Sequence, residues 1–154
     1  MNGALLLPRR RFVLGAAGTF MALSLPSAPA RATAPEVAAL IASLVGEGKL
    51  DKGRVKLEIP LLVENGNAVA MTVGVADAPA EGPGRVASLH VFAERNPLPH
   101  VANFVFGPRS GRPVVSTRIR LATSQTVIAV AKLADGSCWT DSIELLVTLA
   151  ACVE

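Results

Sequence analysis

Aromatic residues are scarce in this chain, which has five phenylalanines, one tryptophan and no tyrosine among 154 residues. A folded core therefore has to be built from Val, Leu, Ile and Ala, which bury well without aromatic rings. The hydrophobic share of 51% is enough for such a core. Both cysteines lie late in the chain, at Cys138 and Cys152, so the composition does not indicate a small domain held together by disulfides.

The chain that follows the N-terminal 32 residues also has no large excess of one charge. The formal net charge of +3 comes from the N-terminus, because residues 1–32 hold four of the 15 basic residues and no acidic residue. The remainder carries 11 basic and 12 acidic residues, a net charge of about −1. No basic stripe with interleaved aromatics is present, so we expect no nucleic-acid partner.

Metal sites and hydrolase sites lack their usual ligands and nucleophiles. The two histidines, His90 and His100, are ten residues apart, and no histidine follows either cysteine as a copper site requires. No nucleophile elbow or paired acidic residues occur. Arg118 and Arg120 share one face of a predicted strand, where they could bind an anion or simply be solvated. We expect no metal, no cofactor and no enzyme activity of the chain's own, and a surface position for His90.

The N-terminus has the pattern of a twin-arginine export signal. Arg9-Arg10 precedes Phe12 by two residues, a weakly apolar stretch follows, and Ala30-Arg31-Ala32 is a small-x-small cleavage site. The alternative is a membrane anchor, but Pro26 limits a helix to residues 12–25, about 21 Å against a hydrocarbon core of about 30 Å. We therefore predict a signal at 1–32, a periplasmic location and no membrane association after cleavage.

The remaining chain predicts one helix followed by strands. Apolar residues at helical spacing over 37–45, with Pro35 before them and Gly46 and Gly48 after them, indicate a helix within the segment 33–52. From Gly53 the apolar period becomes two, and Asn65-Gly66 is expected to supply the positive φ of a tight hairpin turn. The strands are predicted around 55–59, 69–75, 89–93, 101–106, 115–121, 127–133 and 143–149. About seven short strands without a strand–helix–strand rhythm predict an all-β fold, an immunoglobulin-like antiparallel sandwich over 53–149.

The third residue from the end is a cysteine. The strand-like run stops at Leu149, and Ala150, Ala151, Cys152, Val153 and Glu154 follow. We expect these five residues to form a mobile arm, which extends at most about 16 Å. The alternative is a buried or disulfide-bonded cysteine. Glu154 and the terminal carboxylate disfavour the Cys152 thiolate, so the thiol needs activation in a partner's site.

The other cysteine, Cys138, is expected to be a small buried hydrophobe at the start of a strand. A strand over 139–149 would separate Cys138 from Cys152 by more than about 30 Å. A disulfide requires Cα atoms within about 7 Å of each other. If the strand is correct, the bridge between the two cysteines is excluded.

From about Gly53 onward the chain resembles the SoxY family, the sulfur-carrier subunits of periplasmic sulfur oxidation. The resemblance lies in several separated motifs in order: Glu64-Asn65-Gly66-Asn67, Ala93–Pro97 with Val101–Phe104, Ser116–Ala122 with Gln125 and Val127–Ala131, Asp135–Ser137, and the terminal arm. It implies an immunoglobulin-like fold, covalent attachment of sulfur intermediates to Cys152, a SoxZ-like subunit as heterodimer partner, and enzymes that accept the arm.

The arm differs from the family's common form, which ends in Gly-Gly-Cys-Gly-Gly. Here it is Ala150-Ala151-Cys152-Val153-Glu154, similar to a SoxY-related branch ending in an Ala-Ala-Cys-Ile-Glu type of sequence. Alanine is stiffer than glycine, and Val153 and Glu154 add bulk and charge. The resemblance therefore implies sulfur carriage as a persulfide or S-thiosulfonate, but not thiosulfate oxidation as the pathway. Two other functions stay open: a docking module whose arm acts non-covalently, and a redox-linked dimer through Cys152.

Overall fold

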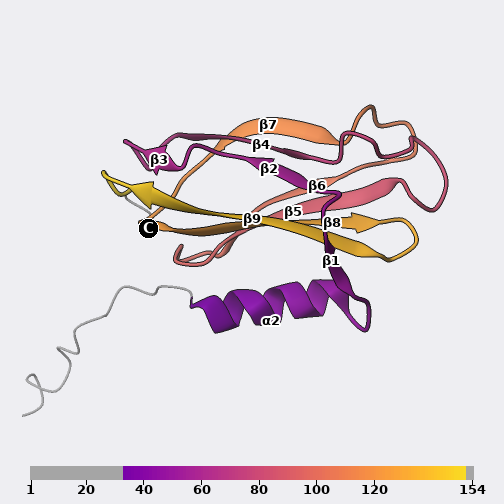
Figure 1. Cartoon of the computed structure of the whole chain (residues 1–154), viewed down its shortest axis with the longest axis horizontal. Coiled ribbons are helices and arrows are strands. Elements are labelled where there is room, and N and C mark those ends of the chain that lie inside the picture. Colours follow the sequence, from indigo (N-terminus) through magenta and orange to yellow (C-terminus); the bar gives the residue numbers. More distant parts are fainter. Residues whose placement is uncertain (1–32, 152–154) are drawn as a thin grey trace, which may run out of the picture.

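The structure is a computed structural model that describes residues 33–151 (Figure 1). Within these residues, one helix, α2 (Ala34–Val45), is followed by nine strands. The strands are β1 (Leu50–Lys52), β2 (Lys56–Glu58), β3 (Leu62–Val63), β4 (Val69–Gly74), β5 (Val86–Ala93), β6 (His100–Val105), β7 (Val114–Ile119), β8 (Gln125–Leu133) and β9 (Cys138–Val147). The predicted signal at 1–32 lies outside the described residues.

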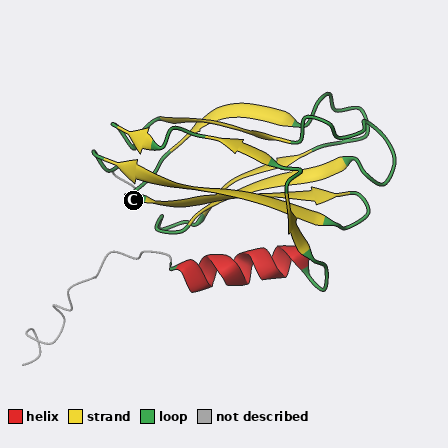
Figure 2. Cartoon of the chain, in the orientation of Figure 1, coloured by secondary structure: helices red, strands yellow, loops and turns green. Residues whose placement is uncertain are grey.

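The strands form two facing sheets, which confirms the predicted immunoglobulin-like sandwich. One sheet has the order β1-β9-β8-β5-β6 with β3 also paired to β9, and the other has the order β2-β4-β7. Figure 2 shows both layers, with the helix outside the larger sheet. All seven predicted strands are present. Two very short ones, β1 and β3, were missed because runs of two or three residues are too short to show a period.

Alternation along the strands builds the core between the sheets. In β4, Val69, Met71 and Val73 are buried, whereas Ala70 is exposed. Most of the core is aliphatic, as the composition requires, and its fully buried members include Leu89, Val91, Val127, Leu133 and Leu145.

Strand β9 has an unusual edge. Both β1 and β3 pair with it in parallel, at Cys138–Thr140 and at Leu146–Val147 respectively, while β2 between them joins the other sheet. The Asp141 carboxylate accepts a hydrogen bond from the Leu57 N–H (2.9 Å) where the chain leaves this edge. The pairing of β1 places residues 50–52 in the larger sheet, so the sandwich starts before the predicted boundary at Gly53, and it is not wholly antiparallel.

Helix α2 covers the outer face of the larger sheet. Val37 and Ile41 are buried against Phe92, Val130 and Cys138. At the helix start, the Thr33 N–H donates to Glu36 Oε2 (2.7 Å), and Gly46 ends the helix with a φ of 67°, in the region that favours glycine. The helix that the spacing over 37–45 predicts is thus present. Among the described residues, no helix is long and apolar enough to cross a membrane.

The prediction of a surface position for His90 is wrong. His90 lies on the outer face of the sheet, as its polar phase indicated, but it is only 8% exposed. Phe92 two residues later is on the same face and contacts α2, so this face of β5 is largely covered. Periodicity identified the face correctly but could not show that a helix packs on it.

Candidate functional site

The predicted arm leaves the sandwich at the end where β9 ends, and we take this end as the candidate site. In Figure 1 the C-terminal end of the described chain lies beside the tips of β3 and β9. Past β9 the backbone stays hydrogen-bonded: the Thr148 N–H donates to the Val63 carbonyl (2.9 Å), and the Leu149 carbonyl accepts from the Gly66 N–H (2.8 Å). We call Thr148–Ala151 the arm root. It is held to the sandwich by the segment that leads from β3 to β4.

Two backbone positions clamp the arm root. The Ala151 N–H donates to the Leu121 carbonyl (3.1 Å), and the Leu121 N–H donates to the Gly66 carbonyl (2.9 Å). Gly66, Leu121 and Ala151 are all buried. This chain of backbone bonds, which we call the root clamp, joins three segments that are distant in the sequence.

Gly66 serves a different purpose from the one predicted. Its φ is not positive, so the expected positive-φ turn at Asn65-Gly66 is wrong. A Cβ at this position would lie 2.9 Å from the Ala151 nitrogen, 3.1 Å from the Leu149 oxygen, and nearer still to the Leu121 oxygen. Glycine is needed because three backbone segments approach each other here.

A buried polar pair supports the clamp from behind. The Asn96 side chain donates to the Arg120 carbonyl and accepts from the Ala122 N–H, both at 2.9 Å, so it binds the peptide groups on either side of Leu121. Gln125 Nε2 donates to Asn96 Oδ1 (2.9 Å), and both side chains are 3% exposed. Buried polar groups that are fully paired specify one geometry. Asn96 and Gln125 therefore fix the Leu121 carbonyl that receives the arm root.

The sequence did not assign a role to Asn96, Gln125 or Leu121. They were visible only as parts of motifs shared with a family, and their common purpose depends on contacts between loops far apart in the chain. Ser124 adds a further link, since its hydroxyl accepts from the Val147 N–H at 2.9 Å.

The free arm was predicted to begin at Ala150, but it does not include Ala151. Ala150 is exposed, but Ala151 is 7% exposed and bonded to Leu121, so Ala151 does not belong to a free segment. Cys152, Val153 and Glu154 lie outside the described residues. One peptide unit and one side chain separate the Ala151 Cα from the Cys152 sulfur, which limits that distance to about 7 Å.

Cys138 is a buried core residue, as predicted. It is fully buried beneath α2, and its thiol donates to the Gly136 carbonyl at 3.6 Å. Burial raises the pKa of this thiol, with Asp135 adding to the effect and Lys132 opposing it. A buried thiol of raised pKa is a poor nucleophile. Cys138 begins β9 and the arm root follows its end, which confirms the strand on which exclusion of a disulfide depends.

The two histidines do meet, on the outer face of the larger sheet. His90 Nδ1 lies 3.2 Å from His100 Nε2, and His90 Nε2 lies 2.9 Å from the Ser88 hydroxyl. Burial lowers the pKa of His90, and His100 and Lys132 lower it further. Among residues 33–151, no three His, Cys, Asp or Glu side chains come together as a metal site would need.

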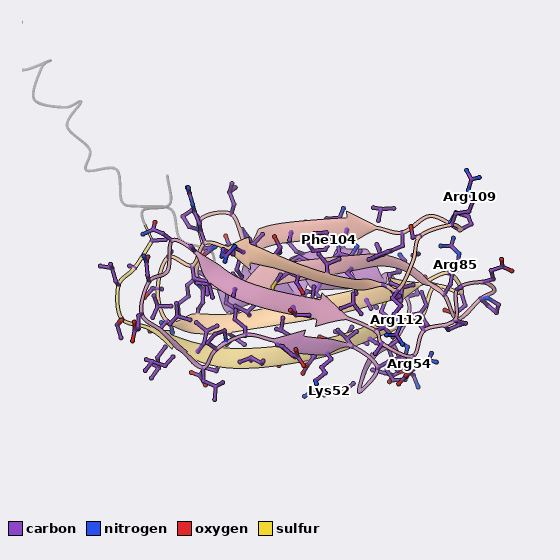
Figure 3. All side chains as sticks on the ribbon, turned by 90° about the horizontal axis from the view of Figure 1, so that it is seen from above. Lys52, Arg54, Arg85, Phe104, Arg109 and Arg112 are labelled. Carbon is purple, nitrogen blue, oxygen red and sulfur yellow. The ribbon has the colours of Figure 1, made fainter. Side chains whose placement is uncertain are left out.

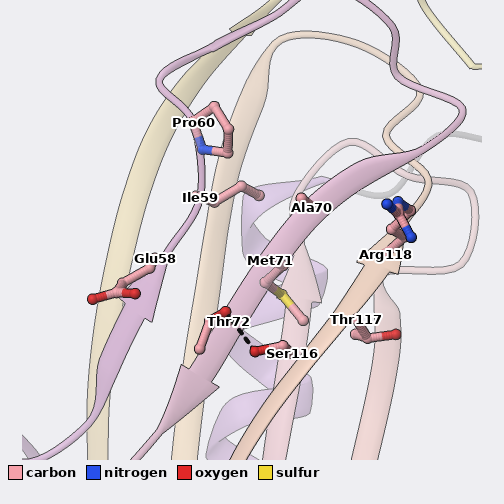
Figure 4. Close-up of a pocket in the computed structure, with 9 residues that line it drawn as sticks. All are labelled: Glu58, Ile59, Pro60, Ala70, Met71, Thr72, Ser116, Thr117 and Arg118. Atoms are coloured by element: carbon pink, nitrogen blue, oxygen red, sulfur yellow. Dashed lines mark hydrogen bonds between the residues drawn. The ribbon is translucent and has the colours of Figure 1, made fainter.

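A hollow of about 580 Å³ lies on the outer face of the β2-β4-β7 sheet. Figure 4 shows Arg118 at one side, Glu58 at the other, and the Thr72 hydroxyl hydrogen-bonded to the Ser116 hydroxyl (2.8 Å) between them. The residues that line the hollow include neither histidine nor cysteine. Arg118 is exposed there, as is Arg120 at the end of β7.

Comparison with known proteins connects this site to a family. The family model for "Sulfur oxidation protein SoxY" matches residues 41–152, a region that reaches as far as Cys152. The sulfur carrier protein SoxY from Chlorobium limicola f thiosulfatophilum has a similar structure, with a TM-score of 0.61 and 27% identity over 76% of this chain and 100% of that one. Among curated proteins, none matches the chain significantly.

Two other similar structures share the fold alone. The superoxide reductase (neelaredoxin) from Ignicoccus hospitalis gives a TM-score of 0.55 at 19% identity, covering 62% of this chain and 80% of that one. The superoxide reductase from Nanoarchaeum equitans gives 0.52 at 16% identity, covering 63% and 100%. Since the SoxY match spans most of the chain and includes the clamp and the arm cysteine, the chain belongs to the SoxY family.

Proposed function

We propose that this protein is a sulfur carrier, which holds sulfur intermediates covalently on Cys152 and presents them to partner enzymes. The observation that carries the proposal is the SoxY match, which extends through the whole sandwich to Cys152. The described geometry supports it, because the root clamp brings the chain out at one end of the sandwich with the cysteine next in sequence. Cys138 is buried on the opposite face of the larger sheet from the core and cannot take this role without unfolding.

The chemistry of loading follows from the thiol. In persulfide transfer, the Cys152 thiolate attacks the outer sulfur of a donor persulfide, a new S–S bond forms as the donor's bond breaks, and the donor leaves as a thiol. This exchange needs no external oxidant. Formation of an S-thiosulfonate from thiosulfate joins the two sulfur atoms, releases the thiol proton and removes two electrons, which an electron-accepting centre in the loading enzyme must take. The carrier itself performs neither activation nor oxidation.

The carrier's place in the cell rests on the sequence. The Arg9-Arg10 motif supports twin-arginine export to the periplasm, and the family supports a heterodimer with a SoxZ-like subunit. The alanine arm supports enzymes whose sites differ from those that accept a glycine arm. Signal cleavage can be read from the N-terminal sequence of the exported protein, which should begin near residue 33.

A pair of cysteine variants tests the proposal in cells of the source organism. Cys152→Ser should abolish growth-linked oxidation of reduced sulfur compounds, while Cys138→Ser should keep it if the variant accumulates normally. Full activity of the Cys152→Ser strain would contradict covalent carriage and favour the non-covalent docking module, for which Val153→Ala and Glu154→Ala should matter more. Non-reducing gels test the redox-linked dimer, which would appear as a Cys152-dependent band of doubled mass.

A further inference from the structure

Four exposed leucines lie in the arm root or beside it. Leu61, Leu62, Leu146 and Leu149 are 67%, 59%, 62% and 60% exposed. Leu62 is the register partner of Leu146, and the Leu146 N–H donates to the Leu61 carbonyl (2.8 Å). Leu149 follows three residues later and bonds to Gly66 in the root clamp. We call these four residues the leucine rim.

The leucine rim is a large part of the apolar surface that the described chain exposes. Nine large hydrophobic side chains of residues 33–151 are exposed, and these four lie on two adjacent segments at one end. Single exposed leucines are ordinary, but a group of them marks a contact surface. Three labelled arginines, Arg85, Arg109 and Arg112, lie toward the end of the sandwich away from the arm in Figure 3.

The short link between Ala151 and the Cys152 sulfur indicates what the leucine rim contacts. Since Ala151 is the last clamped residue, the Cys152 sulfur lies within about 7 Å of the Ala151 Cα. The catalytic group of a loading enzyme has to reach this sulfur. The surface of that enzyme must therefore also come close to the end of the sandwich that carries Ala151. An enzyme cannot process the thiol while remaining far from Leu146 and Leu149, as it could with a long free arm.

We propose that the leucine rim is the docking surface for the enzyme that loads sulfur onto Cys152. The rim seals against an apolar collar around the enzyme's site, excludes water from the thiol and aligns it for attack. This inference rests on the proposed carrier function. It differs from that function in assigning recognition to the sandwich rather than to the arm sequence alone.

The test compares loading with and without the enzyme. The variant is Leu62→Ser with Leu146→Ser, and the matched control is Val105→Ser, a residue 77% exposed at the far end of β6. Starved cells that express each protein receive thiosulfate, with sulfide in a parallel culture. The rate at which intact Cys152 protein gains mass is then measured. In parallel, the purified proteins are treated with inorganic polysulfide, which transfers sulfur to the thiol by breaking its own S–S bond.

We expect the rim variant to load about tenfold or more slowly in cells, because buried apolar anchors dominate such interfaces. The rim variant should be loaded by polysulfide at the wild-type rate. Val105→Ser should load at the wild-type rate both in cells and with polysulfide. Undiminished loading of the rim variant in cells would overturn the inference alone. Loss of a co-purifying subunit from the rim variant would also overturn it, since the rim would then be a permanent interface. If the wild type gains no adduct from either compound, the proposed function fails and this inference fails with it.

Discussion

Substituting Gly66 by alanine should open the root clamp. The added Cβ would approach the Leu121 oxygen, the Ala151 nitrogen and the Leu149 oxygen, all of them backbone atoms that cannot rotate away. Separations under 3 Å, as this Cβ would have to the Ala151 nitrogen at 2.9 Å, force a backbone shift. The segment carrying Gly66 therefore has to move away from Leu121 and Leu149.

That movement disrupts up to three hydrogen bonds. They join Gly66 to Leu149 (2.8 Å), Leu121 to Gly66 (2.9 Å) and Ala151 to Leu121 (3.1 Å). At about 1 kcal/mol for each bond, the free energy of unfolding should fall by about 2–3 kcal/mol. For a domain of this size the melting temperature should fall by about 10 °C.

Two assays read this change. Thermal unfolding gives the melting temperature, and a nitroxide label on Cys152, in a Cys138→Ala background, reports the tumbling of the residue next to the clamp. We expect Gly66→Ala to lower the first and to sharpen the spectrum of the second. Gly111→Ala is the matched control, because a Cβ there meets nothing within 4 Å. If Gly66→Ala leaves both readouts at their wild-type values, the root clamp does not hold the arm root.

Three more changes have defined outcomes. Asn96→Ala should lower the free energy of unfolding by about 2–4 kcal/mol in urea titrations, since it leaves the Arg120 carbonyl and the Ala122 N–H unpaired. Burial lowers the pKa of His90, so as the pH falls the unfolded chain takes up a proton at this residue before the folded chain does. The free energy of unfolding should therefore drop below about pH 6.5, where a free histidine titrates. His90→Gln should flatten this dependence of stability on pH in urea titrations from pH 8 to 5. Cys138→Ala should cost about 1 kcal/mol of stability, yet leave the Cys152 adduct intact by mass spectrometry.

Each of these outcomes can fail in a specific way. An Asn96→Ala protein as stable as the wild type would mean that water replaces the amide and that the polar pair is not needed for the clamp. A slope unchanged in His90→Gln would assign the acid sensitivity to other groups. Loss of the adduct in a well-folded Cys138→Ala protein would give Cys138 a part in sulfur transfer.

Most of the fold could be predicted from strand periodicity, because an aliphatic core between two sheets requires apolar and polar residues to alternate along each strand. Val69, Met71 and Val73 illustrate this, since their inward positions follow from spacing alone. Pairing partners do not follow from spacing. The parallel contacts of β1 and β3 with β9 depend on where the chain crosses between sheets, which local sequence does not determine.

The sequence predicts thiol chemistry at Cys152, which stays a prediction, and it did not indicate the geometry of the residues that lead to it. Cys152 stood out by position and by resemblance, whereas the burial of Ala151 could not be anticipated. Asn65-Gly66 has the composition of a tight turn, yet the glycine is required by the close approach of Leu121 and Leu149. Such a requirement arises only once distant segments are packed together.

The intact mass of the protein tests the central claim most directly. The protein is purified from its native periplasm without reductant, and its mass is measured before and after reduction. The carrier account predicts adducts at Cys152 that reduction removes, in steps of one sulfur atom or one thiosulfate, and their absence from Cys152→Ser. A bare thiol under conditions of active sulfur oxidation, or a disulfide-linked dimer as the sole product, would contradict it.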